Sequence, residues 1–136
     1  MEVLTACALI TILGVIAVPR LHEIGAPFVL RQTTQQIAAE FQKARMRAIA
    51  RNARYRFTYN ASTRVYSLER EATPGNFVAE YSNQLVTGIT LGTISGTPTF
   101  DTRGMLASDV SIPVNVNAST TTRTVTINVL GKVTIS

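Results

Sequence analysis

Chemically reactive side chains are scarce in this sequence. Cysteine and histidine each occur once among the 136 residues, as Cys7 and His22. A single cysteine excludes an intrachain disulfide, and Cys7 lies in an apolar run, where a reduced thiol fills space in a core. The lone histidine stands next to Glu23 just outside the apolar run, where an interfacial polar residue is expected rather than a catalytic base, which needs both an orienting partner and a nucleophile. We therefore expect no metal site and no cofactor.

Catalytic and nucleotide-binding motifs are also missing. The sequence has no CxxC, no P-loop and no GxSxG. The glycine-containing stretch 92–96 precedes no predicted helix, so it does not resemble a phosphate cradle. Asp101 and Asp109 flank Arg103 and Gly104 in a loop-like composition rather than in a cation-binding cluster. We expect no catalytic residue, and the protein is not predicted to be an enzyme.

Acidic residues are few, with eight against thirteen basic ones, which gives a net charge of +5. Six of the basic residues fall between Lys43 and Arg56, so the excess is local. A local basic patch can bind nucleic acid, anionic lipid headgroups or an acidic partner. A solvated helix face gives the same pattern and is the commoner case.

A run of sixteen residues from Val3 to Val18 has no charge, and it follows Glu2 and precedes Pro19. It is shorter than the roughly 20 residues of a typical spanning helix. A secretory signal would carry Lys or Arg before the run, whereas here Glu2 stands there, and a carboxylate in hydrocarbon is costly. The pattern favours a helix that lies in a membrane at one stage and among protein at another.

A helix of 3.6-residue period is predicted over 28–52, after a soft region at 19–27 that contains two prolines and a glycine. Its apolar stripe consists of Leu30, Thr34, Ile37, Phe41, Ala44 and Ala48. A separate basic stripe consists of Lys43, Arg47, Arg51 and Arg54. One side of the helix should therefore pack on a core while another side faces water.

Short strands are predicted over the rest of the chain, and Pro113 indicates an edge strand or a bulge. The predicted ranges are 54–59, 64–69, 77–81, 85–91, 98–101, 110–116, 123–129 and 132–136. The fold class is α+β: a long N-terminal helix followed by a small antiparallel β-sandwich head. Residues 1–27 form the apolar N-terminal helix, and residues 28–136 form the head, with its strands within 54–136.

Two interpretations of the basic cluster stay open. In one, Lys43, Arg47, Arg51 and Arg54 bind DNA or another anion, and Tyr55, Phe57 and Tyr59 are stacking groups. In the other, the basic side chains are solvated and the three aromatic residues, which share one strand face, point into the core. We favour the second.

The N-terminal pattern of Glu2, the uncharged run and Pro19 resembles that of type IV pilins and of the pseudopilins of type II secretion. The stretch "FQKARMRAIARNARYRFTY" (41–59) is similar to the "ARxxAxxRN" helix end of H-type pseudopilins and FimT-type minor pilins. Phe100 and Gly104, followed by "TVTINVLGKVTIS", resemble the closing β-hairpin of that family. In the family the acid follows a cleaved leader and a few mature residues, so we expect those to be missing before Met1.

The resemblance implies a structural subunit, more a minor than a bulk one, of a type IV pilus-like or type II secretion filament. It implies a single pass through the bacterial inner membrane, a periplasmic head, and contacts with other pilin subunits through the N-terminal helix. Glu2 and Pro19 would be its assembly residues.

Some FimT-type proteins are implicated in DNA uptake through a Gly-Arg-x-Arg motif near the C-terminus. This chain keeps Gly131 and the first basic position, as Lys132, and lacks the second. A DNA-binding minor pilin of natural transformation is thus the alternative function, and a signal-anchored periplasmic adaptor is the third.

Overall fold

The computed structural model describes residues 2–96, 98–117 and 120–136, and for residues 2–24 it describes the backbone but not the side chains. Within these ranges, the helix α1 (Glu2–Arg51) precedes eight strands. The strands are β1 (Tyr55–Asn60), β2 (Val65–Thr73), β3 (Asn76–Gln84), β4 (Ile89–Leu91), β5 (Thr99–Phe100), β6 (Val110–Val116), β7 (Thr122–Ile127) and β8 (Val133–Ile135). A helix followed by antiparallel strands confirms the α+β prediction.

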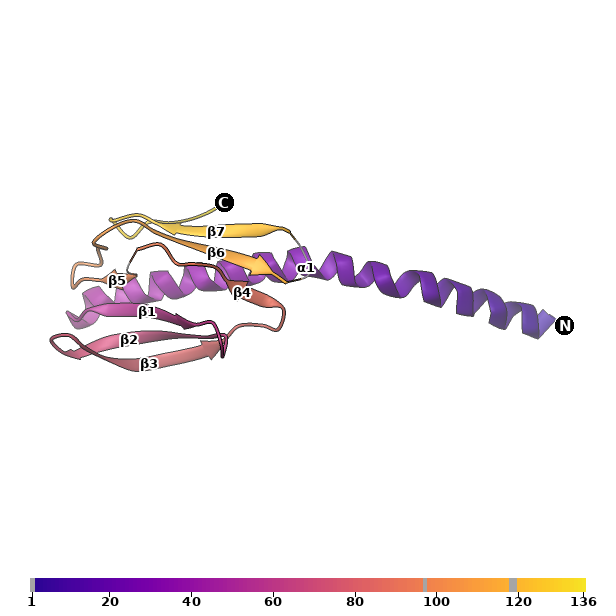
Figure 1. The fold of residues 1–136 in the computed structure, drawn as a ribbon, viewed down its shortest axis with the longest axis horizontal. Helices are drawn as coiled ribbons and strands as arrows, with labels where there is room; N and C mark the ends of the chain where they lie inside the picture. Colours follow the sequence, from indigo (N-terminus) through magenta and orange to yellow (C-terminus); the bar gives the residue numbers. More distant parts are fainter. Residues whose placement is uncertain (1, 97, 118–119) are drawn as a thin grey trace.

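The strands form two antiparallel sheets, with the orders β3-β2-β1-β5 and β4-β6-β7-β8. Helix α1 contacts β1 and β5 of the first sheet and β6, β7 and β8 of the second. Figure 1 shows the C-terminal half of α1 lying along the strands, while its N-terminal half extends beyond them. One core is therefore shared by the helix and both sheets. The narrower prediction of a β-sandwich stays a prediction.

The predicted apolar stripe of α1 is buried, which confirms that this face packs on the head. Its six members are each 0–1% exposed: Leu30, Thr34, Ile37, Phe41, Ala44 and Ala48. The hydroxyl of Thr34 donates to the carbonyl oxygen of Leu30 at 2.6 Å, so burial leaves it hydrogen-bonded. Phe41 packs between two aromatic rings, with centroid distances of 4.7 Å to Phe57 and 6.2 Å to Phe100.

Helix α1 runs without interruption through positions 19–27 and ends at Arg51. The predicted soft region overlaps residues whose side chains are outside the description, and it stays a prediction. At the C-terminal end, Asn52 adopts a left-handed φ of 48°, and the N–H of Ala53 donates to the carbonyl of Ala48 at 3.2 Å. This is the Schellman arrangement, in which Asn is one of the residues tolerated at the left-handed position. In the part of the chain that the structure describes, no helix is long and apolar enough to cross a membrane.

The aromatic residues of β1 belong to the core. Strand β1 pairs with β2 as the predicted hairpin, from Tyr55 opposite Arg70 to Asn60 opposite Val65. Tyr55 is 0% exposed and Phe57 is 3% exposed, while Tyr59 is partly buried against the same core. The interpretation of these rings as surface stacking groups is therefore wrong, and the core interpretation is confirmed.

Pro113 lies in an interior strand, so the prediction of an edge or a bulge is wrong. Strand β6 pairs in regular register with β4 on one side and β7 on the other. The pairing of β4 with β6 ends at Leu91 and Val114, so the missing N–H of Pro113 lies one residue beyond the last pair. There the N–H of Gly92 donates to the carbonyl oxygen of Pro113 at 2.8 Å. A Cβ on Gly92 would lie 2.6 Å from Cγ of Pro113, so the proline ring is accommodated by a glycine opposite it.

Candidate interaction surface

The basic cluster between Lys43 and Arg56 is largely neutralised within the molecule. Five of its six members form ion pairs: Lys43 with Glu40 (2.9 Å), Arg47 with Glu80 (3.2 Å), Arg51 with Glu80 (2.8 Å), Arg54 with Glu71 (3.2 Å) and Arg56 with Glu69 (2.5 Å). The sixth, Arg45, has no carboxylate partner among the described side chains, and its Nε is buried without a hydrogen bond. The cluster therefore consists of five paired cations and one exception.

Glu80 joins three elements at the C-terminal end of α1. Its Oε1 pairs with Arg47 and Arg51, which lie one turn apart on α1, and its Oε2 accepts the hydroxyl of Tyr55 from β1 at 2.7 Å. Glu80 itself comes from the edge strand β3. The network thus links the sheet edge to the helix and to β1 through two exposed ion pairs and one partly buried hydrogen bond.

The pKa values in this network shift as its geometry requires. Burial acts to raise the pKa of the Glu80 carboxyl, but the hydrogen bond from Tyr55 and the charges of Arg51, Arg47 and Arg70 outweigh it and lower the pKa below its ordinary value of 4.5. Burial and the hydrogen bond to Glu80 raise the pKa of Tyr55. The carboxylate is therefore held in its charged form by the folded state.

We expect Glu80→Gln to lower the stability of the head by about 1 kcal/mol near neutral pH, since it removes a charged acceptor from three donors. Because the folded-state pKa is lowered, the stability that ionised Glu80 contributes is present above its ordinary value of 4.5 and is lost as pH falls through the lowered pKa. Thermal melts of wild type and variant from pH 7 to pH 3 should therefore converge. A difference that stays constant over this range would contradict the network.

Most of the residues predicted to bind DNA or another anion are paired with carboxylates of the same head. Arg47 and Arg51 share Glu80, while Lys43 and Arg54 pair with separate glutamates. Lys132 is exposed in the turn between β7 and β8. Phosphates would have to compete with carboxylates at four of these five positions, and DNA or anion binding stays a prediction.

Glu2 and Pro19, the predicted assembly residues, lie on the N-terminal half of α1. Their side chains lie outside the described residues, and their roles stay predictions.

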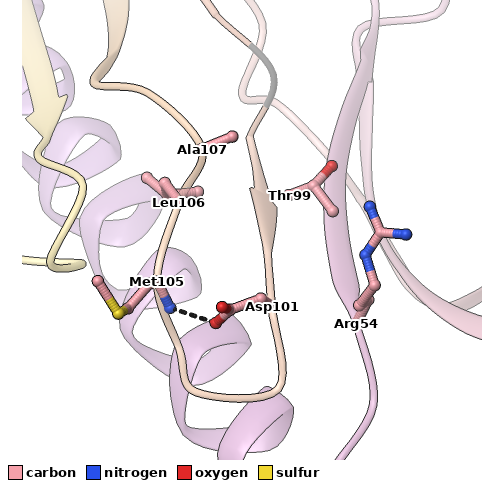
Figure 2. A pocket seen from close by; sticks show the side chains of 6 residues that line it. All are labelled: Arg54, Thr99, Asp101, Met105, Leu106 and Ala107. Atoms are coloured by element: carbon pink, nitrogen blue, oxygen red, sulfur yellow. Dashed lines mark hydrogen bonds between the residues drawn. The ribbon is translucent and has the colours of Figure 1, made fainter.

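A hollow of about 400 Å³ lies beside the segment that follows β5 (Figure 2). Its lining consists of Arg54, Thr99, Asp101, Met105, Leu106 and Ala107. Asp101 accepts the backbone N–H of Met105 at 2.8 Å, the bond drawn in Figure 2, and Arg54 pairs with Glu71. Both charged groups thus serve the fold. Among the described side chains, no three His, Cys, Asp or Glu residues are grouped so as to hold a metal ion.

Arg45 passes through a slot between two glycine turns. A Cβ on Gly104 would lie 2.9 Å from Cγ of Arg45, and a Cβ on Gly131 would lie 2.8 Å from its Cδ and Nε. Both glycines have a left-handed φ, 74° and 76°, and each closes a turn by donating its N–H to the third residue before it. The slot brings together three of the stretches that carry the family resemblance: the helix end, the Phe100–Gly104 segment and the closing hairpin.

We expect Gly131→Ala to lower the stability of the head by about 2–4 kcal/mol, because a left-handed φ and overpacking are both unfavourable for alanine. The added Cβ would lie 2.8 Å from the carbonyl oxygen of Gly104 as well as from Arg45. Gly75→Ala is the matched control, since Gly75 has a φ of 82° with nothing within 4 Å of its Cβ position. Chemical denaturation of both variants separates backbone strain from the clash, and equal losses would mean that the slot is not tightly packed.

Comparison with protein families gives one match. A family model described as Type II transport protein GspH matches residues 33–131. These residues include the C-terminal part of α1, all strands before β8 and both glycines of the slot. Comparison with curated protein sequences gives no match.

Two solved structures share the fold at low sequence identity. The minor pseudopilin EpsH from the type 2 secretion system of Vibrio cholerae is 12% identical with a TM-score of 0.65, covering 78% of this chain and 94% of that one. The type IV minor pilin FimU of Pseudomonas aeruginosa is 15% identical with a TM-score of 0.64, covering 79% of this chain and 87% of that one.

Proposed function

Because the chain belongs to the GspH family of type II transport proteins, we propose that it is a minor pilin or pseudopilin, a structural subunit of a type II secretion or type IV pilus-like filament. The fold is shared with a minor pseudopilin and with a type IV minor pilin. Both are filament-type proteins, which agrees with the family.

This proposal rests on the difference between the two halves of α1: one packs on the head and the other extends beyond it. Every buried residue that the structure describes lies between Leu30 and Gly131, so the described part of α1 that packs on the head belongs to its C-terminal half. The other half, which holds the uncharged run Val3–Val18, extends beyond the strands (Figure 1). An apolar helix segment that its own domain does not cover is suited to a membrane or to packing with like helices.

In this proposal the subunit waits in the bacterial inner membrane, with its head, a small β-sandwich, in the periplasm. On assembly, its N-terminal helix moves from lipid to contacts with other pilin subunits, and Glu2 and Pro19 serve assembly there. The role is structural and not enzymatic, and both charged side chains of the hollow in Figure 2 are used within the fold.

The alternative, DNA binding in natural transformation, has less support. Five of the six cations between Lys43 and Arg56 pair with carboxylates, and the neighbouring rings of Tyr55 and Phe57 are buried. DNA binding would then depend on basic residues outside those pairs, such as Lys132.

Deleting the gene tests the proposal and identifies the machine. We expect the deletion to reduce either the export of secreted proteins into the medium or the number of surface pili, and a plasmid copy to restore the loss. Wild-type levels of both secretion and piliation in the deletion strain would contradict a role as a filament subunit.

A further inference from the structure

We infer that the surface around Arg45 is a docking site for an acidic, partly apolar surface of a different protein subunit. The inference rests on the proposed filament function and names the chemistry of one neighbour. Its basis is the juxtaposition of a fixed arginine, two unpaired cations and exposed apolar side chains at one end of the head.

The side chain of Arg45 is held in place, but it lacks a hydrogen-bond partner for its buried Nε. Its stem is enclosed by Gly104 and Gly131, and its Nε is buried without a hydrogen-bond partner. A buried polar atom without a partner lowers stability, so the position is poorly explained by folding alone. Arg45 as a whole is partly exposed. Because its stem is fixed, it loses little conformational freedom on binding, and such preorganisation strengthens association.

Two further cations border the slot. Arg103 precedes Gly104 and Lys132 follows Gly131, and both are exposed. Neither has a carboxylate partner among the described side chains. The acids nearest in sequence are already engaged: Asp101 accepts the N–H groups of Arg103 and Met105, and Asp109 accepts that of Val129. The three cations thus have no ion pair among the described side chains, and they outnumber the two aspartates that lie near them in the sequence.

Exposed apolar side chains lie beside these cations. Ile49 is 51% exposed and would touch a Cβ on Gly104, and Met46 lies one helical turn before it at 61% exposure. Leu130, next to Gly131, is 62% exposed. A central arginine with apolar neighbours that exclude water is typical of a protein interface. Nucleic acid would make little use of the apolar part, so the observations favour a protein.

The partner differs from this chain. Each described glutamate, namely Glu40, Glu69, Glu71 and Glu80, pairs with a basic residue of its own head. The other described acids, Asp101 and Asp109, accept the N–H groups of Arg103 and Val129, next to the cations of this surface. A second copy would therefore bring those cations to the contact together with its aspartates, and its net charge of +5 would oppose contact. Charge complementarity requires an acidic surface supplied by another subunit.

The test uses the full chain in cells that assemble the filament. The photo-reactive p-benzoylphenylalanine replaces Leu130, and the crosslinked product is identified by mass spectrometry. We expect a crosslink to a different filament subunit, at a segment that contains Asp or Glu. The double variant Arg103→Glu/Lys132→Glu should reduce the product roughly tenfold, since two ion pairs become repulsive. Arg123→Glu, at the opposite end of β7, is the matched control and should leave the product unchanged.

A second variant separates docking from folding. Arg45→Met keeps an unbranched stem in the slot and removes the unsatisfied Nε, so the melting temperature should stay the same or rise while the crosslink weakens. A fall in melting temperature with an unchanged crosslink would mean that Arg45 serves the fold and would overturn the inference.

The remaining outcomes would overturn the docking inference or change its partner. A crosslink that is insensitive to the charge reversals, or one to a second copy, would overturn the inference. Retardation of duplex DNA that Arg103→Glu/Lys132→Glu abolishes, without a protein crosslink, would replace the protein partner with DNA. The photo-reactive chain is also measured in sheared filaments: its presence there without a charge-dependent crosslink refutes docking alone, whereas its absence refutes the filament function and docking together.

Discussion

Replacing Phe41 with alanine should lower the free energy of unfolding of the head by about 3–5 kcal/mol, the range for truncating a buried phenylalanine. Phe41 is 0% exposed, and its ring lies 4.7 Å from that of Phe57 and 6.2 Å from that of Phe100. It thereby joins α1 to β1 and β5, so the cavity would open where the helix meets the first sheet. Removal of those contacts adds to the loss of apolar burial.

Residues 28–136 suit this measurement, because they contain every buried residue that the structure describes. Urea denaturation should show an earlier midpoint for Phe41→Ala, with little change for the control Gln42→Ala, which alters the adjacent exposed position. An unchanged midpoint for Phe41→Ala would mean that the apolar stripe of α1 contacts another subunit instead of its own head.

Replacing Glu2 with alanine should leave insertion and processing intact but strongly reduce entry into filaments. A carboxylate near a helix N-terminus gains only about 0.3–1 kcal/mol from the helix dipole, while a charge brought toward hydrocarbon can cost a few kcal/mol. We propose that a partner charge resolves this mismatch. In the pilins that the N-terminal pattern resembles, that partner is the free α-amino group of an adjacent subunit, and two charges that leave water together pair only in correct register.

Competition between Glu2→Ala and wild type measures the loss of filament entry. Glu2→Ala and wild type are produced together from the natural gene, and their ratio is measured in membranes and in sheared filaments. The variant should match wild type in membranes and be depleted in filaments, whereas Thr5→Ala, in the same apolar run, should enter normally. Equal incorporation of Glu2→Ala and wild type would mean that Glu2 only caps the helix and has no role in assembly.

The sequence predicted the parts of the fold that follow from local periodicity. The stripe from Leu30 to Ala48 recurs every three or four residues and is buried because any such stripe must be covered. The hairpin of β1 and β2 follows from alternating residues on either side of a polar turn. The prediction for Pro113 was wrong because the number of neighbours of a strand depends on long-range pairing. Strand β4 ends one residue before the position at which Pro113 would have to donate an N–H.

The pairing of the basic cluster could not be predicted in the same way. Glu80 lies on an edge strand far along the chain from Arg47 and Arg51, and only the pairing of β3 with β2 brings it to the end of α1. The slot around Arg45 likewise depends on two turns, at Gly104 and Gly131, whose left-handed backbones meet only in three dimensions. Resemblance to a family pointed to the stretches involved but not to their contact.

The central claim, that this chain is a filament subunit, is tested most directly by quantitative mass spectrometry of filaments sheared from cells. The account predicts peptides of the head in the filament fraction, at a small fraction of the bulk subunit, and their loss from that fraction in cells without the assembly ATPase. Absence of these peptides from wild-type filaments, or equal amounts with and without the ATPase, would contradict it.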